Sequence, residues 1–134
     1  MKGAILLLHL TVFFLLGCSK PIEKEWLRIA SPDGKLEAVL IEESHGGAAG
    51  SVVHNVYIVQ KGKRMKYKTD ELVFEATRIE DAELKWVDRD ILEIRYAQAK
   101  ILHFRNYLTQ CTDDKCKDIE IRETPLTLPP SSKK

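Results

Sequence analysis

Short β-forming segments alternate with turn sequences along most of the chain, and this pattern constrains the fold more than any other feature. Ser31-Pro32-Asp33-Gly34-Lys35 is a turn, because proline fixes one negative φ and Asp-Gly supplies a position of positive φ. The segments Leu36 to Ile41 and Val52 to Val59 are rich in apolar and β-branched residues, as strands are. The glycine-rich stretch between them indicates a loop. Short strands at this spacing predict an antiparallel sandwich, a small barrel or a bent meander.

The second half of the chain continues the same pattern. Glu83 to Val87, the turn Asp88-Arg89-Asp90 and Ile91 to Tyr96 form an expected hairpin. Between Asp70 and Trp86 some apolar residues also lie near helical spacing, so a short helix at 75–83 stays open as an alternative. We therefore predict a mostly β fold of about eight short antiparallel strands. The candidate strand segments are Glu25–Ile29, Leu36–Ile41, Val52–Val59, Arg64–Lys68, Leu72–Phe74, Glu83–Val87, Ile91–Tyr96, Ile101–Tyr107 and Asp118–Glu123.

The N-terminal segment has the organisation of a secretory signal peptide. A short basic head, Met1-Lys2, precedes an apolar run from Ala4 to Leu16. A membrane-spanning helix needs about 20 apolar residues, and this run is shorter and contains His9 and Thr11. The alternatives are a signal anchor that stays in the membrane and a soluble secreted form.

Leu15-Leu16-Gly17-Cys18 resembles the bacterial lipobox. In that family a peptidase cuts before the cysteine, whose thiol carries a diacylglyceryl group. The resemblance implies a signal peptide at 1–17, a lipid on Cys18 and a place in the cell envelope. Ser19 stands where aspartate retains such proteins in the inner membrane, which implies the outer membrane, facing the periplasm, if the host has one.

The remaining chain has the size of one domain. We expect a lipidated tether at 18–24, a single β-rich domain at 25–123 and a flexible tail rich in Pro, Ser and Lys at 124–134. The signal segment holds one of the 21 basic residues, so the remainder balances 20 basic against 20 acidic side chains. A neutral domain has no strong overall field to attract nucleic acid, which we exclude as a partner.

Cys111 and Cys116 predict a disulfide that closes a small polar loop between two strands. A metal site would need a second ligand pair, and neither Cys-x-x-Cys nor His-x-x-x-His occurs in the chain. Free thiols are the remaining alternative.

Two further resemblances concern the mature chain. The Ser31–Leu40 and Trp86–Ile94 segments resemble single blade hairpins of the β-propellers in TolB-type periplasmic proteins. A closed propeller needs at least four blades, for which the chain is too short. The Gly46–Gly50 loop and the Trp86 hairpin also resemble a group of small uncharacterised bacterial lipoproteins. This second resemblance implies a fold and no activity.

Two segments are candidate contact sites. The glycine-rich loop, with His45 beside Glu42 and Glu43, has the residue types of an anion site or a weak metal or acid–base site. Its alternative is an ordinary hairpin loop with an exposed histidine. The basic cluster at 61–68 suits anionic lipid headgroups or an envelope polyanion, and its alternative is an edge strand guarded by lysines. The predicted partner-contact residues are Glu42, Glu43, His45, Gly46, Gly47, Gly50, Lys61, Lys63, Arg64, Lys66 and Lys68.

No catalytic motif is present: Gly-x-Ser-x-Gly, His-Glu-x-x-His and the P-loop pattern are all absent. We predict no catalytic residue, no metal ligand and no cofactor. The sequence favours a lipid-anchored envelope protein, held to the membrane through Cys18, that binds another envelope protein or has a structural role. The alternatives are an inhibitor or immunity lipoprotein against a periplasmic toxin or cell-wall enzyme, and a small-ligand carrier or unrecognised enzyme.

Overall fold

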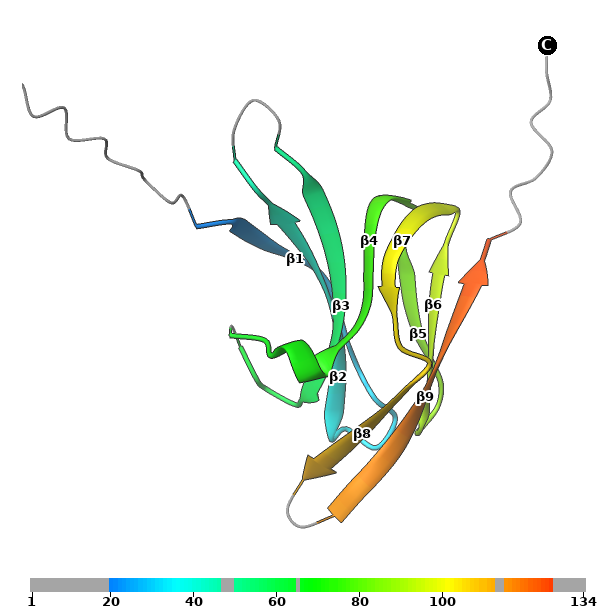
Figure 1. Ribbon diagram of the computed structural model, residues 1–134. Helices are drawn as coiled ribbons and strands as arrows, with labels where there is room; N and C mark the ends of the chain where they lie inside the picture. Colours follow the sequence, from blue (N-terminus) through cyan, green and yellow to red (C-terminus); the bar gives the residue numbers. More distant parts are fainter. Residues whose placement is uncertain (1–19, 47–49, 65, 113–114, 127–134) are drawn as a thin grey trace, which may run out of the picture.

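The computed structural model describes residues 20–46, 50–64, 66–112 and 115–126, and within them the chain is mostly β, as predicted (Figure 1). The signal peptide, Cys18, Gly47 and most of the predicted tail lie outside these residues. The elements are β1 (Ile22–Ala30), β2 (Leu36–Ser44), β3 (Val52–Gln60), the 3-10 turn η1 (Thr69–Glu71), β4 (Leu72–Glu80), β5 (Glu83–Asp88), β6 (Ile91–Tyr96), β7 (Gln98–Phe104), β8 (Tyr107–Thr112) and β9 (Lys115–Pro125).

The first sheet is a five-stranded antiparallel sheet in the order β1-β2-β3-β4-β7. Its centre is the β2–β3 hairpin, in which Leu36 pairs with Gln60 and the register continues unbroken to Ser44 and Val52. Leu40, Val56 and Phe74 are fully buried and come from three adjacent strands. The alternation of inward and outward side chains along each strand therefore turns one face of this sheet into half of the core.

The second sheet has the order β5-β6-β9-β8 and contains one parallel pair. Leu92 of β6 lies opposite Ile121 of β9 in that pair, while β8 and β9 form an antiparallel hairpin. A fully antiparallel arrangement was expected, and it is wrong here. The chain leaves β6, pairs with the first sheet as β7, and returns as β8, and this long excursion brings β9 back in the same direction as β6.

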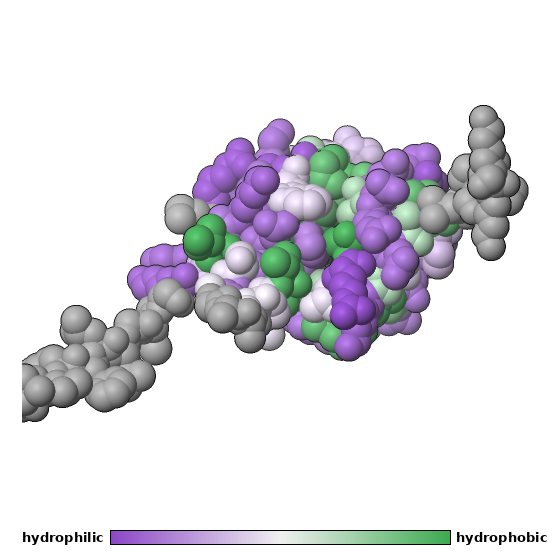
Figure 2. All heavy atoms as spheres, turned by 90° about the horizontal axis from the view of Figure 1, so that it is seen from above, coloured by the Kyte–Doolittle hydropathy of each residue, from purple (hydrophilic) through white to green (hydrophobic). Residues whose placement is uncertain are grey.

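The two sheets pack face to face as a sandwich (Figure 1). Ile58 and Leu40 from the first sheet and Leu92 and Ile119 from the second are fully buried between them. On one side β1 approaches β5, and the Trp86 indole N–H donates to the Ile29 carbonyl at 3.2 Å. Figure 2 shows the molecule from above, with hydrophilic residues over much of the surface and hydrophobic residues in separate smaller groups.

The alternative of a helix at 75–83 is wrong, because β4 covers most of that stretch. Val73 and Phe74 are both fully buried, and the register with β7 shifts between Glu75 and Ala76 and again between Thr77 and Glu80. Arg78 has a φ of 53° at this irregularity. The bulge returns Ile79 to the core face, which explains why the apolar spacing imitates that of a helix.

The predicted strand at 64–68 is also wrong. The chain turns at Gly62, whose φ is 83°, and then runs as an irregular connection into η1. Without a strand, Arg64, Lys66 and Lys68 do not share one strand face, and the interpretation as a guarded edge strand fails with it. Glu37 of β2 and Glu71 of η1 bind backbone N–H groups of this connection, as described below.

Two smaller boundaries differ from expectation. β1 begins at Ile22, so the last residues assigned to the tether belong to the sheet, and β9 continues to Pro125, past the expected end of the domain at 123.

The disulfide between Cys111 and Cys116 is confirmed, and it joins paired residues of β8 and β9 rather than the ends of a longer loop. In the part of the chain described here, no helix has the length and apolar character needed to cross a bilayer.

Candidate functional site

One edge of β8 is open. β8 is the outermost strand of the second sheet and pairs only with β9 in the strand ladders. The N–H of Ile121 donates to the Asn106 carbonyl at 2.8 Å, which fixes which residues of β8 turn their backbone toward β9. Since this orientation alternates along an antiparallel strand, Leu108 and Gln110 face β9, and the N–H and C=O groups of Tyr107, Thr109 and Cys111 point outward.

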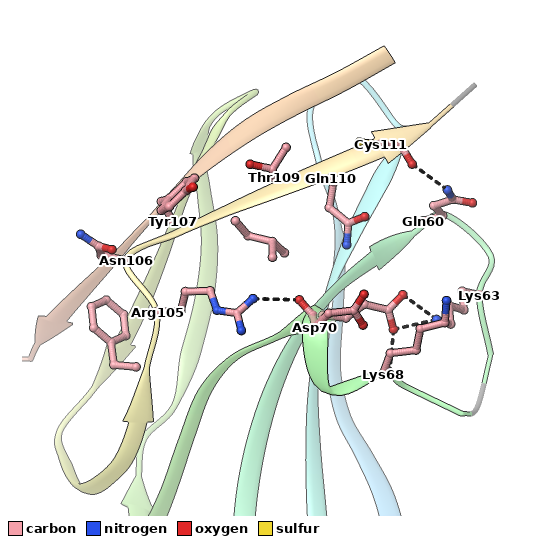
Figure 3. Close-up of a pocket in the computed structure, with 13 residues that line it drawn as sticks. Gln60, Lys63, Lys68, Asp70, Arg105, Asn106, Tyr107, Thr109, Gln110 and Cys111 are labelled. Atoms are coloured by element: carbon pink, nitrogen blue, oxygen red, sulfur yellow. Dashed lines mark hydrogen bonds and ion pairs between the residues drawn. The ribbon is translucent and has the colours of Figure 1, made fainter. Parts of the chain in front are cut away.

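This open edge forms one wall of a groove of about 920 Å³, shown in Figure 3. The opposite wall consists of η1 and the connection that precedes it, with Lys63, Asp70 and Glu71. The backbone groups of β8 therefore meet an accessible hollow rather than a flat surface.

Three side chains tie β8 and its entry to the first sheet and to η1. The Gln60 amide donates to the Cys111 carbonyl at 3.2 Å, and the Gln110 amide donates to the Ile58 carbonyl at 2.8 Å. Arg105 donates to the Asp70 carbonyl at 3.0 Å, as Figure 3 shows. These bonds span both ends of the groove, so its walls are held in place relative to each other.

Glu71 orders the opposite wall. Its carboxylate, which is largely buried, binds the Lys63 ammonium through both oxygens at 2.5 and 2.6 Å. One of those oxygens also accepts the backbone N–H of Lys68 at 2.8 Å. A single carboxylate thereby fixes the chain on both sides of the irregular stretch between β3 and η1.

A second buried carboxylate supports the start of the same connection. Glu37 accepts from the Arg28 guanidinium at 2.6 Å and from the backbone N–H of Gly62 at 3.1 Å. Burial opposes ionisation of Glu37, but the Gly62 N–H and the Arg28 charge outweigh it and lower the pKa of its carboxyl. Arg28 also donates to the Tyr67 hydroxyl at 2.8 Å, so one network joins β1, β2 and the connection.

The disulfide fixes the far end of the open edge. Cys111 and Cys116 are directly opposite in the β8–β9 register, with their Cα atoms 3.9 Å apart. Because Cys111 points its backbone outward, the crosslink occupies a non-hydrogen-bonded pair, where side chains of adjacent strands are closest. The register of the edge is therefore covalently set beside the groove.

The predicted basic cluster is divided by the structure. Lys63 and Lys68 line the groove, and Lys61 lines an adjoining smaller hollow. Arg64 is exposed and lies 3.7 Å from Glu25, and Lys66, with a φ of 55°, is exposed.

The predicted loop cluster does not assemble into one site. Glu42 and Glu43 are adjacent in β2 and so point to opposite faces of the sheet. Glu43 accepts from the Tyr57 hydroxyl at 3.4 Å and lies 3.9 Å from the exposed His45 imidazole. The backbone N–H of His45 donates to the backbone carbonyl of Ser51 across the loop. Gly46 and Gly50 are exposed. β2 ends and β3 begins at this loop, whereas Gln60, which lines the groove, ends β3 at the other end of the hairpin (Figure 1).

His54 is the histidine that Glu42 actually faces. Its Nε2 lies 3.4 Å from the Glu42 carboxylate, and Trp26 packs edge to face on the ring at 5.0 Å. Burial lowers the pKa of the imidazole and outweighs the opposing effect of Glu42. Solvent reaches neither ring nitrogen, so this pair is a buried feature of the sheet rather than an accessible site. Within the described ranges, no three His, Cys, Asp or Glu side chains gather as a metal site.

Sequence reasoning missed four residues that shape the groove: Gln60, Arg105, Thr109 and Gln110. No short motif contains them, because they come from two segments about 45 residues apart in the chain. The alternation from Tyr107 to Cys111, with only Leu108 buried, was the available signal for β8. No protein-family description, curated protein or solved structure matches this chain.

Proposed function

We propose that this protein is a binding module that holds an extended peptide segment along the open edge of β8, and that a lipid on Cys18 anchors it in the cell envelope. One observation carries the first part: the outward backbone groups of Tyr107, Thr109 and Cys111 open onto the groove. The anchor rests on the lipobox resemblance at Leu15–Cys18.

An added strand would satisfy the outward N–H and C=O groups of Tyr107 and Thr109 and the N–H of Cys111; the Cys111 carbonyl already accepts from Gln60. In such complexes main-chain hydrogen bonds supply affinity, and alternate side chains of the peptide enter pockets that supply specificity. The groove offers such a surface beside the strand, with Asp70 on the wall opposite it and Arg105 at the Tyr107 end of β8. Because Gln60, Gln110 and Glu71 already hold both walls, little ordering of the protein would oppose binding.

The polar lining of the groove favours this role over that of a small-ligand carrier. Small-molecule sites are mostly apolar and enclose their ligand. Here ten of the thirteen lining residues have polar or charged side chains, the exceptions being Phe104, Leu108 and Cys111. An inhibitory lipoprotein would use the same edge, with an envelope enzyme as the source of the bound segment.

The test removes one outward N–H without removing a backbone hydrogen bond to β9. Thr109→Pro eliminates that donor, and proline is tolerated in an edge strand whose N–H faces away from the sheet. Thr109→Val is the matched control, because both variants lose the Thr109 hydroxyl bond to Asp118, whereas valine keeps the N–H.

Peptides selected from a random display library on the intact protein supply the ligand. We expect the selected peptides to bind the Thr109→Val variant normally and the Thr109→Pro variant at least about tenfold more weakly, the effect of about 1.4 kcal/mol. Equal affinity for the two variants, with both folded by circular dichroism, would refute edge binding.

A further inference from the structure

A second hollow adjoins the groove and is lined by basic residues. It has a volume of about 470 Å³, and Gln60 lines both hollows. Its charged residues are Lys35 from the turn before β2, Lys61 after β3, and Lys115 at the start of β9. All three are exposed, and no described acidic residue lines this hollow. Three separate elements thus bring positive charge to the Cys111 end of the open edge.

The groove itself adds positive charge that its own acids do not neutralise. Lys63 is paired with Glu71, but the Arg105 guanidinium donates to the Asp70 backbone carbonyl and to no carboxylate in the described contacts. Lys68 forms no ion pair with any described carboxylate. No described carboxylate therefore offsets the charge of Arg105, whose side chain is fixed near Tyr107, at the other end of β8.

The balance over the two hollows is strongly positive. Six basic residues line them, whereas only two of their described lining residues are acidic, Asp70 and Glu71. The basic residues are Lys35, Lys61, Lys63, Lys68, Arg105 and Lys115. Asp113 and Asp114 adjoin Lys115 in the sequence and lie outside the described residues, and the excess stays positive with both of them counted. The chain beyond the signal segment is neutral, so this charge is concentrated at one place.

We infer that the segment held along β8 is acidic, an extended peptide with Asp or Glu at alternate positions. This inference rests on the proposed function. Alternate residues of a strand point to the same side, so one face of such a peptide would bring its carboxylates to the lysines that border the edge. Complementary charge of this kind selects among partners and speeds their association.

The acidic residues belong mainly at the end of the peptide that lies next to Cys111. Lys61 and Lys115 border that end of β8, whereas Arg105 stands alone at the Tyr107 end. On the other side of Tyr107, a third hollow is lined by Asp88, Asp90, Asp118 and Glu120. These residues belong to β9 and the β5–β6 hairpin, so the acidic side chains lie on the β9 side of β8 and the basic residues border its open edge.

The test uses three labelled eight-residue peptides of the same β-forming composition, in which alternate positions are all Asp, all Asn or all Lys. Binding to the intact protein is followed by fluorescence anisotropy at low and high salt. We expect the Asp peptide to bind at least about tenfold more tightly than the Asn peptide, and the Lys peptide most weakly. Raising the ionic strength from about 0.05 to 0.3 M should remove most of the advantage of the Asp peptide.

A pair of charge-reversal variants locates the effect. Lys35→Glu/Lys61→Glu/Lys115→Glu should abolish the preference for the Asp peptide. The control Lys85→Glu/Arg89→Glu/Lys100→Glu makes the same change in net charge at exposed positions outside both hollows, and should leave affinity within about twofold. Equal loss in the two triple variants would overturn the inference, because it would show a response to net charge alone.

The outcomes separate the inference from the function on which it rests. If the Asn or Lys peptide binds as tightly as the Asp peptide and Thr109→Pro still abolishes binding, edge binding stands and the acidic partner is wrong. If the Asp peptide binds equally to Thr109→Pro and Thr109→Val, both proposals fail, as they do if no peptide of any charge binds. Sedimentation of the free protein as a dimer that Thr109→Pro dissociates would identify a second copy as the occupant and overturn the inference.

Discussion

Replacing Arg28 by methionine should destabilise the protein substantially, because it leaves a buried carboxylate without its cation. The Arg28 and Glu37 side chains are only 11 % and 10 % exposed, and their closest atoms are 2.6 Å apart. Methionine keeps most of the apolar stem of arginine and removes the charge. The second carboxylate on Arg28, that of Glu25, is 37 % exposed and remains hydrated after the substitution.

The expected cost follows from what Glu37 retains. Breaking a buried ion pair by removing one partner costs about 3–5 kcal/mol. Glu37 keeps the Gly62 N–H bond at 3.1 Å and a small solvent contact, so we expect the lower end of that range, about 3 kcal/mol. The double variant Arg28→Met/Glu37→Leu removes both charges from the buried site. It should therefore cost less than the single variant, because no unpaired charge remains.

Urea unfolding at pH 7, followed by tryptophan fluorescence, measures both values as changes in the free energy of unfolding. A loss below about 1 kcal/mol for Arg28→Met would refute the account of this pair, as would a double variant less stable than the single one. Because the pKa of Glu37 is lowered in the folded state, its stabilising effect is present above pH 4.5. It should disappear as the pH falls through the lowered pKa.

Three further predictions concern a histidine, the disulfide and the anchor. The pKa of His54 is lowered, so the folded state favours the neutral imidazole and the free energy of unfolding should fall as the pH drops below 6.5. In His54→Leu, the free energy of unfolding measured with urea should depend less on pH between 7.5 and 5.5. An unchanged dependence on pH would contradict this. Cys111→Ser/Cys116→Ser should lower the free energy of unfolding by about 2 kcal/mol, since the bridge closes a short loop, and a change below about 0.5 kcal/mol would show that the bridge adds little. Cys18→Ala should leave the precursor uncleaved and unlipidated, and an unchanged mass of the membrane-extracted protein would exclude lipid on that cysteine.

The elements that the sequence predicts well are those defined by local patterns. The Pro-Asp-Gly turn, the β2–β3 hairpin and the β5–β6 hairpin each combine alternating side chains with turn residues a few positions away. The pairing of Cys111 with Cys116 is similarly local. In each case the partners are close along the chain, so short-range chemistry is sufficient to specify the contact.

The elements that the sequence does not predict depend on distant partners. The polar alternation of Arg64 to Lys68 is typical of a strand. However, the Glu37 carboxylate accepts the backbone N–H of Gly62, and the Glu71 carboxylate accepts that of Lys68. The parallel pairing of β6 with β9 depends on where β7 and β8 run, which no local pattern records. The groove has the same origin, because the bonds from Gln60 to Cys111 and from Gln110 to Ile58 form only after the two sheets pack.

Amide hydrogen exchange of β8 tests the open edge most directly. In the free protein, the outward N–H groups of Tyr107, Thr109 and Cys111 should exchange rapidly, while those of Leu108 and Gln110, bonded to β9, should be slow. Saturation with a selected peptide should slow exchange at the three outward positions and leave the two inward positions unchanged. If the outward positions exchange as fast with peptide bound as without it, β8 does not receive a strand and the proposed mode of binding is wrong.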